Sequence, residues 1–505
     1  MKRQRRIGRR SALAVALGLS GSLAATLAVA DELVAPQVRW GTCPRDVVAE
    51  AAPTELQCAT VAVPVDYAKP EGTQIDLMIS RLASKNPDKR RGTLMLNPGG
   101  PGGSGLTQPA LLVSRGLPAG VLDSYDVIGM DTRGIGRSAP VRCGFTEDGP
   151  YTSNIPPYAV DDAAVTARAK VAKQAAQQCA RHDRNGLLRH LTTANTARDL
   201  DRIRAALGEE KTSYLGYSYG TALGAAYASM FPERSDRIVL DSNIGGTHLD
   251  REGMRRYALG MEQSFPDFAR WAAARHDSYG LGRTPAAVRR TYFTLAQRLD
   301  KAPVAGFDGN LLRQYTFGNL FKKTQYPKLA QQWQALAAGH DAVHDAVARL
   351  PSQNVTAGKA SSAIDNPLAV FAAVTCNDVE WPENVDTYRH GVAKDRGRYP
   401  LFGAAAANIT PCAFWPHTPA EPPVAVNDDG PRNVLLVQNL RDPVTPHQGG
   451  KMLREKFEER SRLLSVDDTG HGAYVLGDNP CALNTTTRYL VDGTMPGKDT
   501  LCRAG

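Results

Sequence analysis

The clearest chemical feature of this sequence is a serine inside a glycine-flanked turn. Residues 216–220 read Gly-Tyr-Ser-Tyr-Gly and match G-x-S-x-G, a pattern in which a buried strand turns sharply into a helix and exposes a serine hydroxyl. An apolar run precedes the pattern, and small residues follow it over 221–230, as a strand and a helix require. A side chain at either glycine would collide with the neighbouring strand and helix. We therefore predict that Ser218 is a nucleophile rather than part of a plain strand–turn–helix junction.

A serine hydroxyl becomes a good nucleophile only when a base removes its proton and an acid orients that base. The chain order nucleophile, acid, histidine is typical of one large class of hydrolases. Asp442 follows the apolar run 433–438 by four residues, and His471 lies just past the apolar run 462–466. The 29 residues between them fit one helix and one strand. We predict that Asp442 is the acid and that His471 is the base.

Two other residues compete for these roles. Asp241 ends the apolar run 237–242 and would be the acid in a variant arrangement. His447 comes five residues after Asp442 with no strand between them, so we expect it to cap or decorate a helix. The other histidines have no comparable placement, and no cluster of residues has the spacing of metal ligands.

A glycine-rich loop follows a short apolar strand. Residues 92–97 are apolar, and residues 98–105 read Pro-Gly-Gly-Pro-Gly-Gly-Ser-Gly. A phosphate loop would end in Gly-Lys-Ser/Thr, which is absent, and a dinucleotide-binding loop is the other alternative. An oxyanion loop is the better interpretation. We predict that the N–H of Tyr219 and that of Gly100, in preference to Gly99, form the oxyanion hole of an acyl-transfer site.

The surrounding pattern predicts an α/β fold. Near-continuous apolar strands alternate with helices up to residue 245, which is typical of a parallel sheet covered on both faces. Two β-like runs, 58–65 and 75–82, precede them as an edge hairpin. A helix is expected near Thr196, with Thr196 and Asp199 as a capping box and Gly208 at its end. The expected parts are a core at 31–245, an inserted helical cap at 246–425, with a surface loop at 351–366, and a returning core at 426–505.

Composition excludes several other classes of function. The formal net charge is +9, but six positive charges and no acid lie in residues 1–30, which leaves +3 for the rest. No basic stripe with interleaved aromatics follows, so we expect no nucleic-acid partner. Residues 1–30 have a basic start, an apolar stretch and Ala-Val-Ala at 28–30, typical of a cleaved export signal rather than a membrane anchor. We expect a secreted protein with no membrane segment in its mature form.

Cysteine usage agrees with export. The chain has eight cysteines and no C-x-x-C, so disulfides are favoured over metal binding. Eight cysteines permit 105 connectivities, so spacing alone does not determine the pairing. We predict that neighbours pair in order, each closing a local loop: Cys43 with Cys58, Cys143 with Cys179, Cys376 with Cys412, and Cys481 with Cys502.

Several motifs occur together in a fixed order. They are 98–105, Asp-x-Arg-Gly-x-Gly-x-Ser at 131–138, Asn-Thr-Ala-Arg-Asp-Leu-Asp-x-Ile-Arg at 195–204, the turn 216–220, Cys-Asn-Asp-Val-Glu-Trp-Pro at 376–382, Arg-Asp-x-x-Thr-Pro at 441–446 and Gly-His-Gly at 470–472. As a set, they resemble the secreted tripeptidyl aminopeptidases of the prolyl aminopeptidase family, and the similarity extends over almost the whole mature chain. The resemblance implies an α/β-hydrolase fold with a TAP-like C-terminal region.

The resemblance also implies a serine peptidase that removes short peptides from a free amino terminus. Its cap would carry acids that bind the ammonium group of the substrate, with Asp378 as the first candidate and Glu380 as the second, against a plain surface acid beside a disulfide. We expect a monomer without a cofactor. The alternatives are a carboxylesterase or amidase with the same catalytic residues, and a binding protein on an inactive scaffold. An epoxide hydrolase or dehalogenase is excluded, because an aspartate would stand in place of Ser218.

Overall fold

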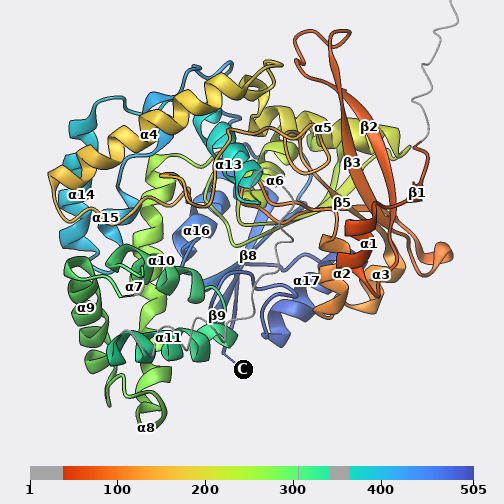
Figure 1. Ribbon diagram of the computed structural model, residues 1–505. Coiled ribbons are helices and arrows are strands. Elements are labelled where there is room, and N and C mark those ends of the chain that lie inside the picture. The colour runs from red at the N-terminus through yellow and green to blue at the C-terminus, as the bar shows by residue number, and fades with distance from the viewer. Residues whose placement is uncertain (1–37, 305, 340–362, 505) are drawn as a thin grey trace, which may run out of the picture. The chain divides into compact units, whose positions relative to one another are not determined.

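A mostly parallel, ten-stranded sheet flanked by helices is the centre of the computed structural model, which describes residues 38–304, 306–339 and 363–504 (Figure 1). The α/β-hydrolase fold class expected from the sequence is confirmed. The strands, in spatial order, are β1 (Gly41–Thr42), β2 (Gln57–Pro64), β3 (Gln74–Leu82), β5 (Tyr125–Met130), β4 (Gly92–Asn97), β6 (Thr212–Tyr217), β7 (Ser235–Asp241), β8 (Val434–Arg441), β9 (Ser461–Thr469) and β10 (Thr500–Cys502).

The strand directions place the functional loops on one edge of the sheet. The first three pairings, from β1 to β5, are antiparallel, as the predicted edge hairpin requires, and every pairing from β5 to β10 is parallel. In register, Asn97 pairs with Gly216, and Gly216 pairs with Leu240. The carboxyl ends of β4, β6 and β7 therefore lie in one row, and β8 and β9 continue it.

Helices cover both faces of this sheet. Buried side chains alternate along the central strands, so that Met95 faces one apolar cluster while Leu94 and Leu96 face the other. The first cluster includes residues of α5 (Thr193–Ala206), α6 (Tyr219–Met230) and α16 (His447–Phe457); the second includes residues of α2 (Gln108–Ser114), α3 (Ala119–Ser124) and α17 (Pro480–Asp492). Apolar strands buried on both faces explain the near-continuous hydrophobic runs of the sequence.

The predicted capping residue of α5, Thr196, lies four residues too late. The cap is Thr192, whose side chain accepts from the N–H of Asn195, because a capping residue needs extended backbone and Thr192 has φ −133° and ψ 154°. Thr196 lies inside the helix and donates its hydroxyl to the carbonyl of Thr192. Asp199 forms a buried ion pair with Arg133, at 2.6 Å, instead of closing a capping box.

A helical region lies between β7 and β8. Its helices are α7 (Arg251–Ala273), α8 (His276–Tyr279), α9 (Pro285–Lys301), α10 (Gly309–Asn319), α11 (Tyr326–Ala338), α13 (Asp365–Asp378), α14 (Val385–Arg398) and α15 (Gly403–Ala406). Helix α4 (Asp162–His182) comes from the earlier part of the chain but packs beside α14 (Figure 1). Part of the sequence before residue 245 therefore packs with the helical region rather than with the sheet.

Four disulfides join the cysteines in the predicted order. They are Cys43–Cys58, Cys143–Cys179, Cys376–Cys412 and Cys481–Cys502. The last one attaches β10, a strand that the sequence pattern did not predict, to the start of α17. The predicted export signal, and most of the surface loop expected at 351–366, lie outside the described residues. Within the described ranges, every helix is too short or too polar to cross a membrane.

Candidate active site

Ser218 stands at the sharp turn between β6 and α6. Its φ of 58° and ψ of −124° are rare for a residue with a side chain, and it is the residue before the first turn of α6. A Cβ at Gly216 would come within 2.3 Å of the Gly220 carbonyl oxygen, and one at Gly220 would come within 2.8 Å of the Asn97 carbonyl oxygen. The two glycines are required because backbone passes this close to both of them.

Asp442 and His471 lie side by side at the ends of neighbouring strands. Asp442 directly follows β8, and His471 comes two residues after β9. Strand β8 ends three residues later than the end predicted from the sequence. His471 Nδ1 is 2.9 Å from Asp442 Oδ2 and 3.2 Å from Oδ1. The Asp442 side chain is fully buried and that of His471 is 17% exposed. The structure thus brings together the acid and the base predicted from chain order.

Asp442 is held by the loop that follows it. Its Oδ1 accepts from the N–H groups of Val444 and Thr445, both at 2.9 Å, and its Oδ2 accepts from the Thr445 hydroxyl at 2.8 Å. The same hydroxyl lies 3.3 Å from His471 Nδ1. These donors offset the cost of burying the carboxylate and fix the direction in which it faces His471.

The environment of His471 favours its protonated form. Burial lowers the pKa of His471, but the charge and hydrogen bond of Asp442 and the more distant charge of Asp241 raise it by more, so that the pKa is above its usual value. Such an imidazole readily accepts the proton of a nucleophile. Within the described residues, no hydrogen bond joins Ser218 Oγ to His471, a contact that commonly tightens only when substrate binds.

The glycine-rich loop after β4 lies against the Ser218 turn. A Cβ at Gly99 would come within 2.8 Å of Ser218 Cβ and 3.1 Å of the Tyr219 nitrogen. The Gly99 N–H donates to Asn97 Oδ1 at 2.9 Å, whereas the Gly100 N–H has no acceptor within the described part of the chain. The Tyr219 N–H belongs to the first turn of α6, where no intrahelical acceptor exists. This arrangement agrees with the predicted preference for Gly100 over Gly99.

Asp241, the other candidate acid, forms no hydrogen bond with the His471 ring. It is fully buried at the end of β7, and its carboxylate accepts from the N–H groups of Ala473 and Tyr474, just after the histidine. His447, the other rival, opens α16 and lies 2.8 Å from Ser465 Oγ through Nε2. Neither residue has the geometry of a triad member.

Phe321, from the segment between α10 and α11, is a site contact that sequence reasoning missed. Its carbonyl oxygen accepts from the His471 N–H at 2.8 Å, and its ring lies edge-on to the imidazole at a centroid distance of 5.4 Å. No local pattern identifies it, because it lies 150 residues before the histidine. Thr445, also missed, was recognisable within the Arg-Asp-x-x-Thr-Pro motif.

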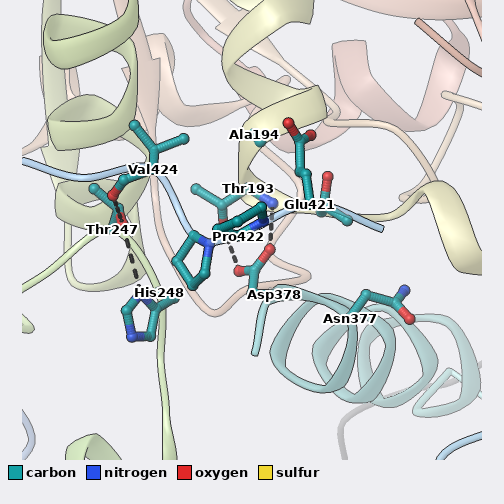
Figure 2. Close-up of a pocket in the computed structure, with 11 residues that line it drawn as sticks. Thr193, Ala194, Thr247, His248, Asn377, Asp378, Glu421, Pro422 and Val424 are labelled. Carbon is teal, nitrogen blue, oxygen red and sulfur yellow. Dashed lines mark hydrogen bonds between the residues drawn. The ribbon is translucent and has the colours of Figure 1, made fainter. Parts of the chain in front are cut away.

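The two predicted cap acids lie in different environments. Asp378 ends α13 and is 6% exposed, with its oxygens bound to the N–H and hydroxyl of Thr193 at 2.7 and 2.6 Å (Figure 2). The Thr193 hydroxyl also lies 2.6 Å from the Tyr219 hydroxyl. Burial raises the pKa of Asp378 to about 7, against the lowering effect of the Thr193 hydrogen bonds. Glu380 is exposed.

A small cavity of about 10 Å³ adjoins Asp378, the space of about one water molecule. Glu421 also lines it, and Figure 2 shows this carboxylate above Pro422, near Thr193. Glu421 binds Arg198 in a bidentate pair at 2.6 and 2.7 Å, which compensates its charge. Among the described residues, no group of three His, Cys, Asp or Glu side chains is placed to hold a metal ion.

The sheet order, the serine at the turn after β6 and the Asp–His pair after β8 and β9 define the α/β-hydrolase class. A family profile described as "TAP-like protein" matches residues 399–502. The tripeptidyl aminopeptidase of Streptomyces coelicolor is 36% identical over 480 residues, which cover 92% of this chain and 86% of that protein. The chain therefore belongs to the tripeptidyl aminopeptidase family, and it is a serine hydrolase.

Two further relatives have different names. The serine protease Hip1 of Mycobacterium tuberculosis is 29% identical over 492 residues, covering 94% of this chain and 92% of that protein. Carboxylesterase B of the same organism is 30% identical over 485 residues, covering 93% and 91%. Relatives named for peptide and for ester hydrolysis thus match this chain over similar lengths.

Proposed function

We propose that the chain is an exported exopeptidase that releases tripeptides from free amino termini, with Ser218, His471 and Asp442 as its catalytic triad. The observation that carries the proposal is the 2.9 Å contact between His471 Nδ1 and Asp442 Oδ2, at the same sheet edge as the Ser218 turn. The 36% identical relative named tripeptidyl aminopeptidase supports the substrate class.

The proposed reaction is acyl transfer in two steps. Ser218 Oγ attacks the carbonyl carbon of the scissile peptide bond while His471 accepts the hydroxyl proton. The N–H groups of Tyr219 and Gly100 donate to the oxygen that becomes negative. His471 then gives its proton to the leaving amine, and the tripeptide remains as an ester on Ser218. Water, deprotonated by His471, hydrolyses this ester and restores the hydroxyl.

We further propose that a cap acid binds the ammonium group of the substrate. Asp378 is the better candidate, because it is buried beside a cavity with room for an ammonium group but for little more. An acetylated amine would be neutral and too large for this space. Glu380, two residues later, is exposed and would act only at the rim of a binding site.

Export is supported by the four disulfides. Disulfides persist in oxidising compartments and are rare in the reducing cytosol. The pairing of all eight cysteines within the described residues therefore fits the secreted location that the N-terminal sequence predicts.

The deciding experiment compares three chromogenic substrates on the purified protein: a tripeptide anilide with a free amine, the same peptide N-acetylated, and a butyrate ester. The proposal expects cleavage of the free-amine peptide, with kcat/KM at least about 100-fold lower for the acetylated one because an ionic contact is lost. Equal cleavage of both peptides, or faster cleavage of the ester, would replace the exopeptidase assignment with a carboxylesterase or amidase.

The cap acid has its own test. Asp378→Asn should raise KM for the free-amine peptide and leave the residual rate on the acetylated peptide unchanged. Glu380→Gln is the matched control, since it neutralises an acid two residues away on the surface. An unchanged preference in Asp378→Asn would remove this residue from the substrate site without affecting the triad.

A further inference from the structure

Asp241 connects the two loops that carry Ser218 and His471. Its main-chain carbonyl oxygen accepts from the Ser218 N–H at 3.0 Å. Its carboxylate accepts from the Ala473 N–H, at 3.0 Å from both oxygens, and from the Tyr474 N–H at 2.6 Å. One residue at the end of β7 therefore holds the nucleophile turn through its backbone and the histidine loop through its side chain.

Ser242 extends this attachment by one residue. Its hydroxyl donates to Asp241 Oδ1 at 3.0 Å and accepts from the Gly472 N–H at 2.8 Å. The three consecutive N–H groups directly after His471 thus bind two side chains. One belongs to Asp241, the last residue of β7, and the other to Ser242, the first residue of the loop that follows. Ser242 has a φ of 63°, an unfavourable value that persists only where surrounding contacts determine the backbone.

Burying the Asp241 carboxylate costs more free energy than a purely structural contact would require. The side chain is fully buried, and no lysine or arginine forms an ion pair with it within the described ranges. A buried charge without a cation destabilises the fold unless hydrogen bonds compensate it, and a neutral acceptor could bind the same N–H groups at lower cost. Burial raises the pKa of Asp241 to about 6, although the N–H donors and His471 lower it.

The charge of Asp241 acts on His471. The groups that influence the histidine are Asp442 and Asp241, which raise its pKa, and Lys322, which lowers it. Those around Asp241 are His471, the Tyr217 phenol and the donors described above. A negative charge here favours the imidazolium that forms when His471 takes the serine proton.

We propose that Asp241 is a positioning residue for the reaction, which holds the loop of His471 against the Ser218 turn and stabilises the imidazolium as a second buried acid. The inference rests on the proposed triad, because it gives Asp241 a role only through His471. Asp442 orients the ring directly, whereas Asp241 determines where the backbone of the loop lies.

The test uses Asp241→Asn in the full protein, with Asp126→Asn as the matched control. Asp126 is also a buried aspartate of the sheet, but it accepts from Ser84 and Arg90 at the start of β5, the opposite edge. Active sites are counted with a fluorophosphonate probe, in which the serine oxygen displaces fluoride from phosphorus. Rates per active site are then measured from pH 5 to 9.

Asp241→Asn should lower kcat about tenfold or more with KM little changed, because a displaced histidine loop affects the transition state rather than binding. Its acid limb of kcat/KM should move to lower pH by about half a unit or more, since the lost charge raised the pKa of His471. Asp126→Asn should leave the limb in place. A lowered kcat with an unmoved limb would reduce Asp241 to a structural anchor and overturn the proposal.

Ser242→Ala keeps the test decisive if Asp241→Asn does not fold. It frees the Gly472 N–H and removes one donor to Asp241 but keeps the carboxylate, so kcat should fall about three- to tenfold with a smaller shift of the acid limb than in Asp241→Asn. An unchanged kcat would contradict the proposal. His471→Ala, measured in parallel, separates a failure of the triad from a failure of the role given to Asp241. If His471→Ala stays active, the proposed triad is wrong. If it is inactive while Asp241→Asn behaves as wild type, the triad stands and Asp241 has no positioning role.

Discussion

The carboxyl edge of the sheet and the helical region between β7 and β8 are stabilised by opposite means. At the edge, hydrogen bonds hold the acid of the site: Asp442 receives two N–H groups, a hydroxyl and an imidazole. The helical region instead centres on an aromatic cluster of Phe265, Phe268, Tyr292 and Trp333, all fully buried, with ring centroids 5.2 to 6.1 Å apart. Hydrogen bonds have direction, whereas apolar packing depends mainly on volume.

The two regions should therefore tolerate different substitutions. Substitutions at the sheet edge should alter turnover with a modest effect on folding, and substitutions in the aromatic cluster should do the reverse. The regions meet beside the histidine loop, at Phe321 and at two ion pairs, Lys323–Asp468 and Arg441–Asp267. Substitutions at these contacts should have small effects on both turnover and stability.

The largest expected effect is that of Ser218→Ala. Removing the nucleophile should lower kcat/KM at least about 10³-fold and leave the melting temperature within a few degrees, because the hydroxyl makes no contact that the fold needs. Steady-state kinetics and thermal unfolding measure the two quantities. Ser229→Ala, at the far end of the same helix, is the control and should stay active. Residual activity above a tenth of wild type would place the nucleophile elsewhere.

Phe268→Ala should affect stability rather than chemistry. Phe268 is fully buried and contacts Trp271, Tyr326 and Trp333, so its truncation leaves a cavity that costs about 3–5 kcal/mol of unfolding free energy. Denaturant unfolding should show this loss, while kcat/KM per active site changes less than twofold. Phe293→Ala, in the same region but half-buried, should cost less. A large loss of kcat/KM in folded Phe268→Ala would contradict the division between the regions.

Phe321→Ala tests the contact between them. The substitution removes the ring beside His471 but keeps the carbonyl that binds the His471 N–H. An aromatic pair contributes about 0.5–1.5 kcal/mol, so kcat/KM should fall about two- to tenfold. Phe321→Tyr keeps the ring and should retain the rate. If both variants lose activity equally, the ring contact with His471 is not the cause.

The smallest effect is expected at the Lys323–Asp468 ion pair. The lysine side chain is 45% exposed, so Lys323→Ala should cost less than about 1 kcal/mol, and the difference from wild type should shrink in high salt. Thermal unfolding at two salt concentrations measures it. A salt-independent loss of several degrees would show that the side chain acts through packing rather than charge.

Local patterns predicted the features that depend on a few consecutive residues. The Ser218 turn could be predicted because backbone approach within five residues requires both glycines, and the central strands because they are apolar on both faces. The end of β8 could not be predicted, because Gln438 and Asn439 interrupt the apolar run. Their side-chain amides donate to the Thr445 and Gly470 carbonyls. Phe321 and the Thr193–Asp378 contact join segments more than a hundred residues apart, and no single-sequence pattern encodes such pairs.

The disulfides bear on how the chain acquires its connectivity. Each one joins two cysteines that are consecutive along the chain, so no closed loop encloses or overlaps another. A polypeptide that emerges with its N-terminus first presents each pair completely before the next cysteine appears. If the chain emerges in this order, each native pair can close before the next cysteine appears, without crossed bonds among the 105 pairings that eight cysteines allow.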